Sequence, residues 1–168
     1  MTTTVRPERP EDVAAIRAAV ASAFPSEIEA RLIDLLRAAG RLSVSLVAEV
    51  DGEVVGHVGF SPVAVDSGVV GAGLAPLAVL ESHRRRGIGA KLVVAGLAAC
   101  REAGFGWAVV LGEPRYYGRF GFLPAPGFGL SDEYGGGDAF QVVELTPGSI
   151  PEGAGLVRYA PEFASLGE

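Results

Sequence analysis

Two uninterrupted apolar runs with a helix-like segment between them constrain the fold of this 168-residue chain more than any other feature. The runs cover residues 71–80 and 107–112, and neither alternates apolar with polar residues. Such continuous runs are typical of strands that are buried on both faces. Between them, apolar residues recur at helical spacing at Ile88, Leu92, Val93, Gly96, Leu97 and Cys100. The order strand, helix, strand predicts a parallel βαβ unit.

The rest of the sequence predicts one mixed-sheet α/β domain that covers residues 1–168. Helical spacing of apolar residues predicts helices over 13–24 and 28–39, the second opened by a capping box of Ser26 and Glu29. Asp51-Gly52, between two apolar stretches, predicts a β-hairpin. Short strands are expected over 3–6, 140–145 and 155–159, with one or two helical turns over 115–120.

A basic segment with two glycines joins the first apolar run to the following helix. Residues 81–91 read Glu-Ser-His-Arg-Arg-Arg-Gly-Ile-Gly-Ala-Lys. Gly87 and Gly89 have no Cβ, so a ligand can approach their backbone N–H groups closely. These groups precede a helix, where unpaired donors and the positive end of the helix dipole favour phosphate. We therefore predict a phosphate-cradling loop; the alternative is an ordinary solvated basic turn.

Charge supports a small anionic ligand rather than a polymer. The formal net charge is −6, yet residues 81–91 alone carry +3, which leaves −9 for the remainder. A positive spot on an acidic body argues against general nucleic-acid binding.

The longest apolar run, residues 69–80, is shorter than the roughly 18 residues that a membrane span needs. The first ten residues lack the apolar core of a signal peptide. We therefore expect a cytoplasmic protein.

Known phosphate motifs narrow the interpretation of the loop. Gly87-Ile88-Gly89 lacks the third glycine of the dinucleotide fingerprint, and no acid follows at the required distance. The Gly-Lys-Ser/Thr triplet of ATP-binding P-loops is absent from the sequence. What fits is the pattern Arg/Gln-x-x-Gly-x-Gly/Ala, which residues 84–89 satisfy.

These residues carry a family resemblance. The segment from Leu77 to Leu92 resembles motif A of the GNAT N-acetyltransferase superfamily, whose members bind acetyl-CoA. Residues 110–122 resemble motif B with its Tyr-x-x-x-Gly-Phe ending, and Val5-Arg6-Pro7 resembles the family's first strand and helix. The Gly-Glu-Pro-x-Tyr-Tyr variant is similar to a subgroup of mostly uncharacterised predicted acetyltransferases. The resemblance implies a central sheet with a splayed parallel strand pair.

The resemblance also implies roles for individual residues. Leu77 would polarise the thioester carbonyl with its N–H group, and Val79 would bind the pantetheine arm. The backbone from Arg84 to Ala90 would wrap the pyrophosphate, and Tyr117 would be the general acid. The implied catalytic residues are Tyr117 and Leu77. The implied acetyl-CoA-binding residues are Leu77, Ala78, Val79, Arg84, Arg85, Arg86, Gly87, Ile88, Gly89, Ala90, Gly112 and Tyr117. The lone Cys100 excludes an intramolecular disulfide and a cysteine-based metal site.

The sequence leaves the acid, the general base and the class of function open. Tyr116 is the alternative acid. Histone-type members carry a glutamate that acts as the general base where this chain has Gly73. The base here would instead be Glu49, Glu113, His57 or an ordered water, or the amine would arrive already neutral. The expected reaction is direct acetyl transfer to a primary amine of a small molecule or protein. A non-catalytic acyl-CoA-binding module and a nucleotide-binding protein are the alternatives. A homodimer is open, and neither nucleic acid, metal nor membrane is an expected partner.

Overall fold

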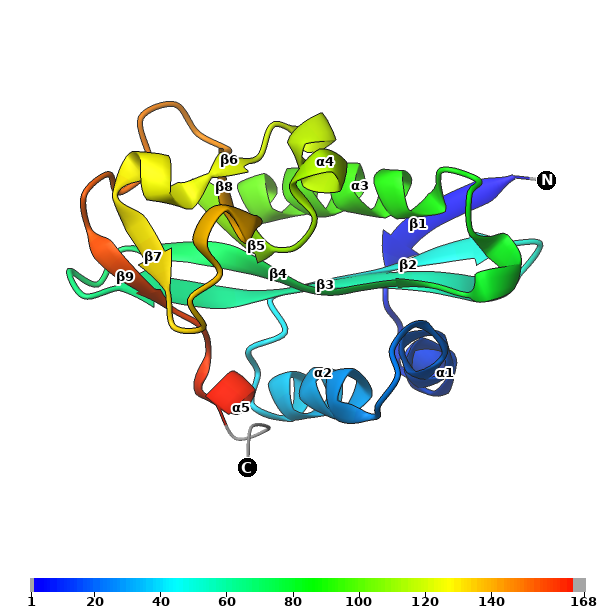
Figure 1. Cartoon of the computed structure of the whole chain (residues 1–168). Helices are drawn as coiled ribbons and strands as arrows, with labels where there is room; N and C mark the ends of the chain where they lie inside the picture. Colours follow the sequence, from blue (N-terminus) through cyan, green and yellow to red (C-terminus); the bar gives the residue numbers. More distant parts are fainter. Residues whose placement is uncertain (1, 165–168) are drawn as a thin grey trace.

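The predicted βαβ unit lies at the centre of a single open sheet in the computed structural model, which describes residues 2–164 (Figure 1). β4 (Val70–Val79) and β5 (Trp107–Leu111) are parallel neighbours joined by α3 (Ile88–Glu102), as the apolar pattern predicts. Both strands are buried along most of their length. The sheet order is β1-β2-β3-β4-β5-β8-β6.

The strands before β4 form an antiparallel ladder. β1 (Thr3–Pro7) is the edge strand and pairs with β2 (Val44–Val50), which pairs with β3 (Glu53–Val65). The β2–β3 turn has positive φ at both Asp51 (51°) and Gly52 (81°). Positive φ at both central residues is the hairpin geometry that an Asp-Gly pair favours. The predicted hairpin is thus confirmed.

After β5 the chain forms short elements that cover one end of the sheet. α4 (Pro114–Tyr117) continues into a 3₁₀ turn (Gly118–Phe120), where one or two helical turns were expected. The strands are β6 (Leu123–Pro124), β7 (Leu130–Asp132), β8 (Phe140–Glu144) and β9 (Gly155–Arg158). β9 pairs with β3 and runs parallel to β7. β6 and β7 are too short for periodicity to predict.

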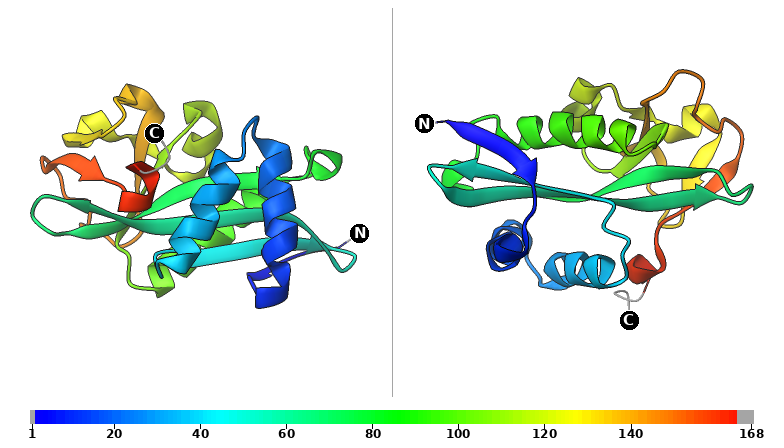
Figure 2. Two further views of the ribbon diagram at one scale, coloured as in Figure 1. Left: turned by 90° about the horizontal axis from the view of Figure 1, so that it is seen from below. Right: turned by 180° about the vertical axis from the view of Figure 1, so that it is seen from behind.

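Helices cover both faces of the sheet (Figures 1 and 2). α1 (Val13–Ala23), α2 (Ile28–Ala38) and α5 (Pro161–Ala164) lie on one face, and α3 lies on the other. The predicted capping box at α2 is wrong. The N-cap residue is Glu27, without a side-chain cap bond, and the Glu29 carboxylate meets the Ser26 hydroxyl instead of a backbone N–H group.

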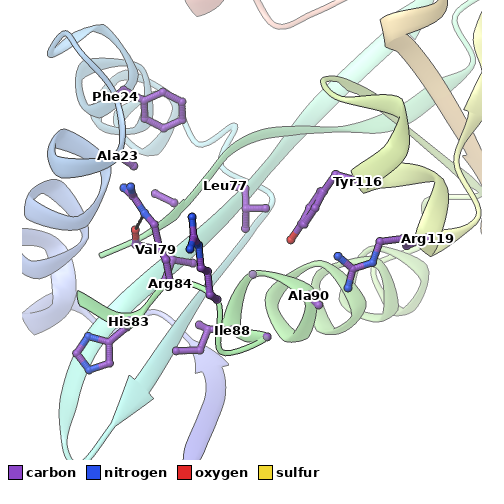
Figure 3. Close-up of a pocket in the computed structure, with 14 residues that line it drawn as sticks. Ala23, Phe24, Leu77, Val79, His83, Arg84, Ile88, Ala90, Tyr116 and Arg119 are labelled. Atoms are coloured by element: carbon purple, nitrogen blue, oxygen red, sulfur yellow. Dashed lines mark hydrogen bonds between the residues drawn. The ribbon is translucent and has the colours of Figure 1, made fainter. Parts of the chain in front are cut away.

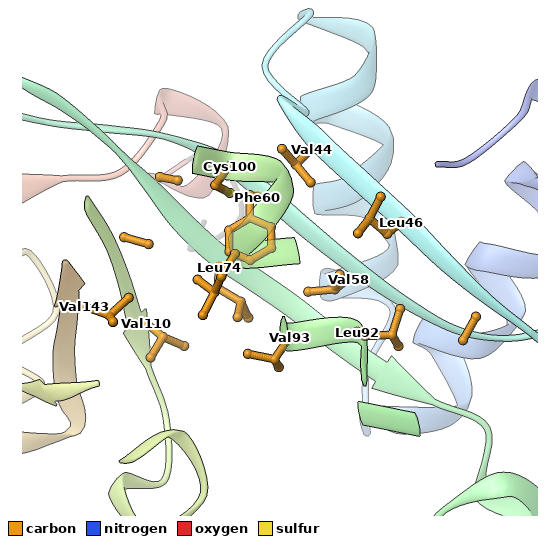
Figure 4. Close-up of a cluster of buried hydrophobic side chains, with 14 of the residues drawn as sticks. Val44, Leu46, Val58, Phe60, Leu74, Leu92, Val93, Cys100, Val110 and Val143 are labelled. Atoms are coloured by element: carbon orange, nitrogen blue, oxygen red, sulfur yellow. The ribbon is translucent and has the colours of Figure 1, made fainter. Parts of the chain in front are cut away.

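The largest apolar cluster fastens α3 to the sheet (Figure 4). Phe60 of β3 is fully buried against α3, and its ring occupies the space beside Gly96. A Cβ at position 96 would lie 2.5 Å from Phe60 Cε2, so only glycine lets the helix approach this closely. Cys100 is also fully buried here, which agrees with a packing role. This packing holds α3 against the sheet.

Candidate functional site

The parallel pair β4–β5 separates before β4 ends. Its register runs from Ala72 opposite Ala108 to Leu74 opposite Val110, and no pairing with β5 follows in the described residues. Pro76, which has no N–H group to donate, comes two residues later. β4 stays paired with β3 on its other edge, where Val58 is opposite Leu77. The wall from Leu77 to Val79 therefore has an edge that β5 does not occupy.

A pocket of about 550 Å³ opens at this separation (Figure 3). One wall is the end of β4, and a second is the loop from His83 to Gly87 with the first residues of α3. The end of α1 supplies Ala23 and Phe24, and the α4 side supplies Tyr116 and Arg119. The inner part is apolar and partly buried, whereas the arginines at the mouth are exposed.

The loop geometry suits an anion. Arg85 (φ 64°) and Gly87 (φ 76°) both have left-handed backbone, and Gly87 is the N-cap residue of α3. Helix starts present unpaired N–H groups and the positive end of the dipole. The Nε group of Arg84 donates a hydrogen bond of 3.0 Å to the carbonyl oxygen of Val79, which ties the loop to the end of β4. None of the described residues that line the pocket is acidic.

Most of the residues expected at the donor site line this pocket. They are Leu77, Ala78, Val79, Arg84, Arg85, Gly87, Ile88, Gly89 and Ala90. Arg86 is exposed and is not part of the lining, because the backbone turns at Arg85. Gly112 is not part of it either. A Cβ at Gly112 would lie 2.4 Å from Cε2 of Tyr117, so this glycine makes room for an aromatic ring.

The two neighbouring tyrosines, the expected acid Tyr117 and the alternative Tyr116, occupy different places. Tyr116 lines the pocket, and its hydroxyl points inward, 2.7 Å from where a Cβ on Gly89 would be (Figure 3). Tyr117 packs against Phe122 and over Gly112, outside the lining. Burial raises the pKa of Tyr116 and raises that of Tyr117 to about 12. Both phenols are therefore protonated at neutral pH.

His83 and Arg119 line the pocket although sequence reasoning gave them no role. His83 is half-buried in the loop wall. Arg119 lies within the stretch that resembles motif B, so its position was a usable signal. Phe24 had no such signal, because its approach to the pocket depends on how α1 packs on the sheet.

None of the carboxylates or histidines considered as the base lines the pocket. Glu49 accepts a hydrogen bond from Arg6, and Glu113 caps α4. His57 is fully buried, with Nε2 2.7 Å from the Ser45 hydroxyl, which makes it a hydrogen-bonded structural residue. At Gly73, the place of a histone-type glutamate, a Cβ would lie 2.7 Å from Val63 Cγ1 and 3.1 Å from Tyr159 Cε1.

Residues 2–164 contain no group of three or more histidine, cysteine or acidic side chains that could hold a metal ion. None of the helices described there combines the length and hydropathy that crossing a bilayer requires.

Comparison with known proteins agrees with this geometry. The acetyltransferase (GNAT) family matches residues 13–122. The uncharacterised N-acetyltransferase YhbS of Escherichia coli K12 is 40% identical over 162 residues, which are 95% of this chain and 97% of YhbS. The crystal structure of E. coli YhbS in complex with CoA is similar, with a TM-score of 0.91, 39% identity and coverage of 96% and 92% of the two chains.

A second solved structure is also similar. The GNAT family acetyltransferase from Brucella melitensis, in complex with acetyl-CoA, has a TM-score of 0.80 and 39% identity, with coverage of 96% of this chain and 98% of the other. The fold, the separated strand pair, the family match and the similarity to these proteins all agree. The chain belongs to the acetyltransferase (GNAT) family.

Proposed function

We propose that the protein transfers an acetyl group from acetyl-CoA directly to a primary amine of a small molecule or protein. The observation that carries the proposal is the separation of β4 from β5 at Leu74, which opens into a pocket with a basic loop at its mouth. The similar proteins from E. coli and Brucella melitensis bind CoA and acetyl-CoA, which supports the choice of donor.

The residues present fit this donor. The uncovered edge of β4 at Leu77–Val79 offers backbone groups to an extended amide-containing arm such as pantetheine. The start of α3, with Gly87 and Gly89, suits the diphosphate, and Arg84 and Arg85 add positive charge there. Val79 is the last residue of the β4 wall, and its carbonyl oxygen accepts a hydrogen bond from the Nε group of Arg84.

Amine attack on a thioester forms a C–N bond and places negative charge on the carbonyl oxygen. We assign the Leu77 N–H group to that oxygen, because a fixed donor stabilises charge that develops in the transition state. The C–S bond then breaks, the thiolate accepts a proton from an acid, and the nitrogen of the new amide releases its extra proton, which restores that acid. Tyr116 is the proposed acid, because its hydroxyl points into the pocket and its raised pKa keeps it protonated.

The amine is the proposed nucleophile without an enzyme-bound acyl intermediate. Cys100 is fully buried in the core and does not line the pocket. Burial also raises the pKa of its thiol to about 12, so the thiolate needed for attack is scarce. Since no described lining residue is a carboxylate, we propose that the acceptor reacts as the neutral amine after losing its proton to water.

The proposal is tested by thiol release from acetyl-CoA in the presence of a library of primary amines. Release that depends on both enzyme and amine, with the acetylated amine identified by mass spectrometry, is the expected result. Binding of CoA by calorimetry without release for any amine would instead support the non-catalytic module. Absence of CoA binding at low salt would refute the proposal as a whole.

A further inference from the structure

The wall of the pocket opposite the basic loop carries one cation, Arg119, that the proposed chemistry does not use. Its guanidinium carbon lies 5.2 Å from the centroid of the Tyr116 ring and 5.5 Å from that of Phe120. Both distances are within the range of cation–π contacts. Stacking on aromatic faces holds the guanidinium plane in place and leaves its N–H donors available to a ligand.

Arg119 has no acidic partner within residues 2–164. In contrast, the described ion pairs engage Arg6, Arg17, Arg37, Arg41 and Arg158 with carboxylates. An unpaired arginine that lines a pocket without acidic residues favours an anion there, and a guanidinium suits phosphate because it can donate two parallel hydrogen bonds.

The pocket therefore offers two places for phosphate. The loop wall has the start of α3 with Arg84 and Arg85, which suits a diphosphate. The α4 wall has Arg119 beside Ala90, without helix-start N–H groups of its own. All three arginines are exposed at the mouth, while Ala78 is buried at the inner end. A donor whose acyl arm enters the inner end leaves its phosphorylated nucleotide at the mouth, between these walls.

We propose that Arg119 binds the 3′-phosphate of CoA and makes the site select CoA over donors that lack this phosphate. The inference rests on the proposed function, because it takes acetyl-CoA as the donor. The 3′-phosphate is a phosphate monoester separate from the diphosphate, so it matches a second cationic position rather than an extension of the first.

The test compares CoA with dephospho-CoA, which lacks only the 3′-phosphate, by titration calorimetry at low salt. The wild type is expected to bind CoA roughly 10-fold or more tightly than dephospho-CoA, the range for hydrogen bonds to a charged group. Arg119→Met should abolish this preference by weakening CoA binding alone. Unchanged affinity for dephospho-CoA in this variant shows that the pocket is intact. Arg119→Lys, which keeps the charge but loses the planar fork, should be intermediate.

Arg115→Met is the matched control, because Arg115 lies on α4, is exposed and does not line the pocket. It should leave both affinities unchanged. Equal weakening of CoA and dephospho-CoA by Arg119→Met would place Arg119 at the diphosphate or in the pocket wall and overturn the inference. An undiminished preference for CoA in Arg119→Met would overturn it too. A wild type that binds neither ligand would refute the proposed function itself, which is a different outcome.

Discussion

The ring of Tyr117 lies against the backbone of Gly112, where the side chain of any larger residue would collide with it. A Cβ at position 112 would be 2.4 Å from Cε2 and 2.9 Å from Cδ2 of that ring. Tyr117 also meets Phe122 edge-on, with 5.8 Å between ring centroids. Gly112 therefore makes room for the ring of Tyr117 at the end of β5, and the neighbouring Tyr116 is the tyrosine that lines the pocket.

Gly112→Ala should lower the free energy of unfolding by about 1–3 kcal/mol, the usual cost of overpacking a tight contact. CoA affinity should change far less, because Gly112 does not line the pocket. Urea unfolding and calorimetry on the same preparations check both expectations. A variant of normal stability that no longer binds CoA would show that Gly112 contacts the donor after all.

Tyr116→Phe should keep acetyl-CoA affinity within a few-fold and lower the acetyl-transfer rate roughly 10- to 1,000-fold. The reason is that only Tyr116 directs its hydroxyl into the pocket. Tyr117→Phe is the matched control and should retain most of the activity. Steady-state kinetics with one amine across pH measure both variants.

The reverse result is equally informative for this pair. Loss of activity in Tyr117→Phe alone would assign the acid to the tyrosine at the motif position. Full activity in both variants would mean that water protonates the departing thiolate.

Arg84→Met and Arg85→Met should each weaken CoA binding and reduce its dependence on salt, because screening acts on charges that meet phosphates. Arg86→Met is the control with the same loss of charge. Arg86 does not line the pocket, so this variant should bind CoA within about twofold of the wild type. A loss in Arg86→Met as large as in the other two would indicate a general electrostatic field instead of specific contacts.

Acid should destabilise the fold partly through His57. Burial lowers the pKa of His57 to about 4 from 6.5, so the unfolded chain binds this proton first as the pH falls. Stability is therefore unaffected by His57 above pH 6.5 and decreases as the pH falls from 6.5 toward 4. The expected loss between pH 7 and pH 4.5 is about 2 kcal/mol.

His57→Gln should flatten this part of the pH dependence, whatever it does to absolute stability. Denaturant unfolding of both proteins at a series of pH values provides the comparison. Parallel curves for wild type and variant would contradict the assignment of the proton uptake to His57.

The strength of local patterns decided how much of the fold and site was predictable from sequence. The βαβ unit follows from two long apolar runs and a periodic helix, and the Asp51-Gly52 hairpin follows from turn chemistry. β6 and β7 were not predicted, because a strand of two or three residues is too short to show a periodic pattern of apolar residues. The capping box failed because the Glu29 side chain can bond the Ser26 hydroxyl instead of the backbone.

The site shows the same limit at the scale of single side chains. Glycine spacing and charge identified the loop. They did not indicate that the backbone at Arg85 is left-handed or that Arg86 lies outside the pocket. Adjacent tyrosines on a one-turn helix point in different directions, and sequence alone does not say which one faces the cavity. That choice depends on Gly112 and Phe122, which pack around Tyr117 in three dimensions.

Because β5 leaves β4 after Leu74, β3 is the only strand that pairs with the wall at Leu77–Val79 in the described residues. Gly56 of β3 stands opposite Val79, and a Cβ there would be 3.1 Å from the carbonyl oxygen of Ala78. A larger residue at position 56 would press on this wall from behind without meeting any ligand. Inherited variation in β3 can therefore retune the donor site while every residue that touches the donor stays the same.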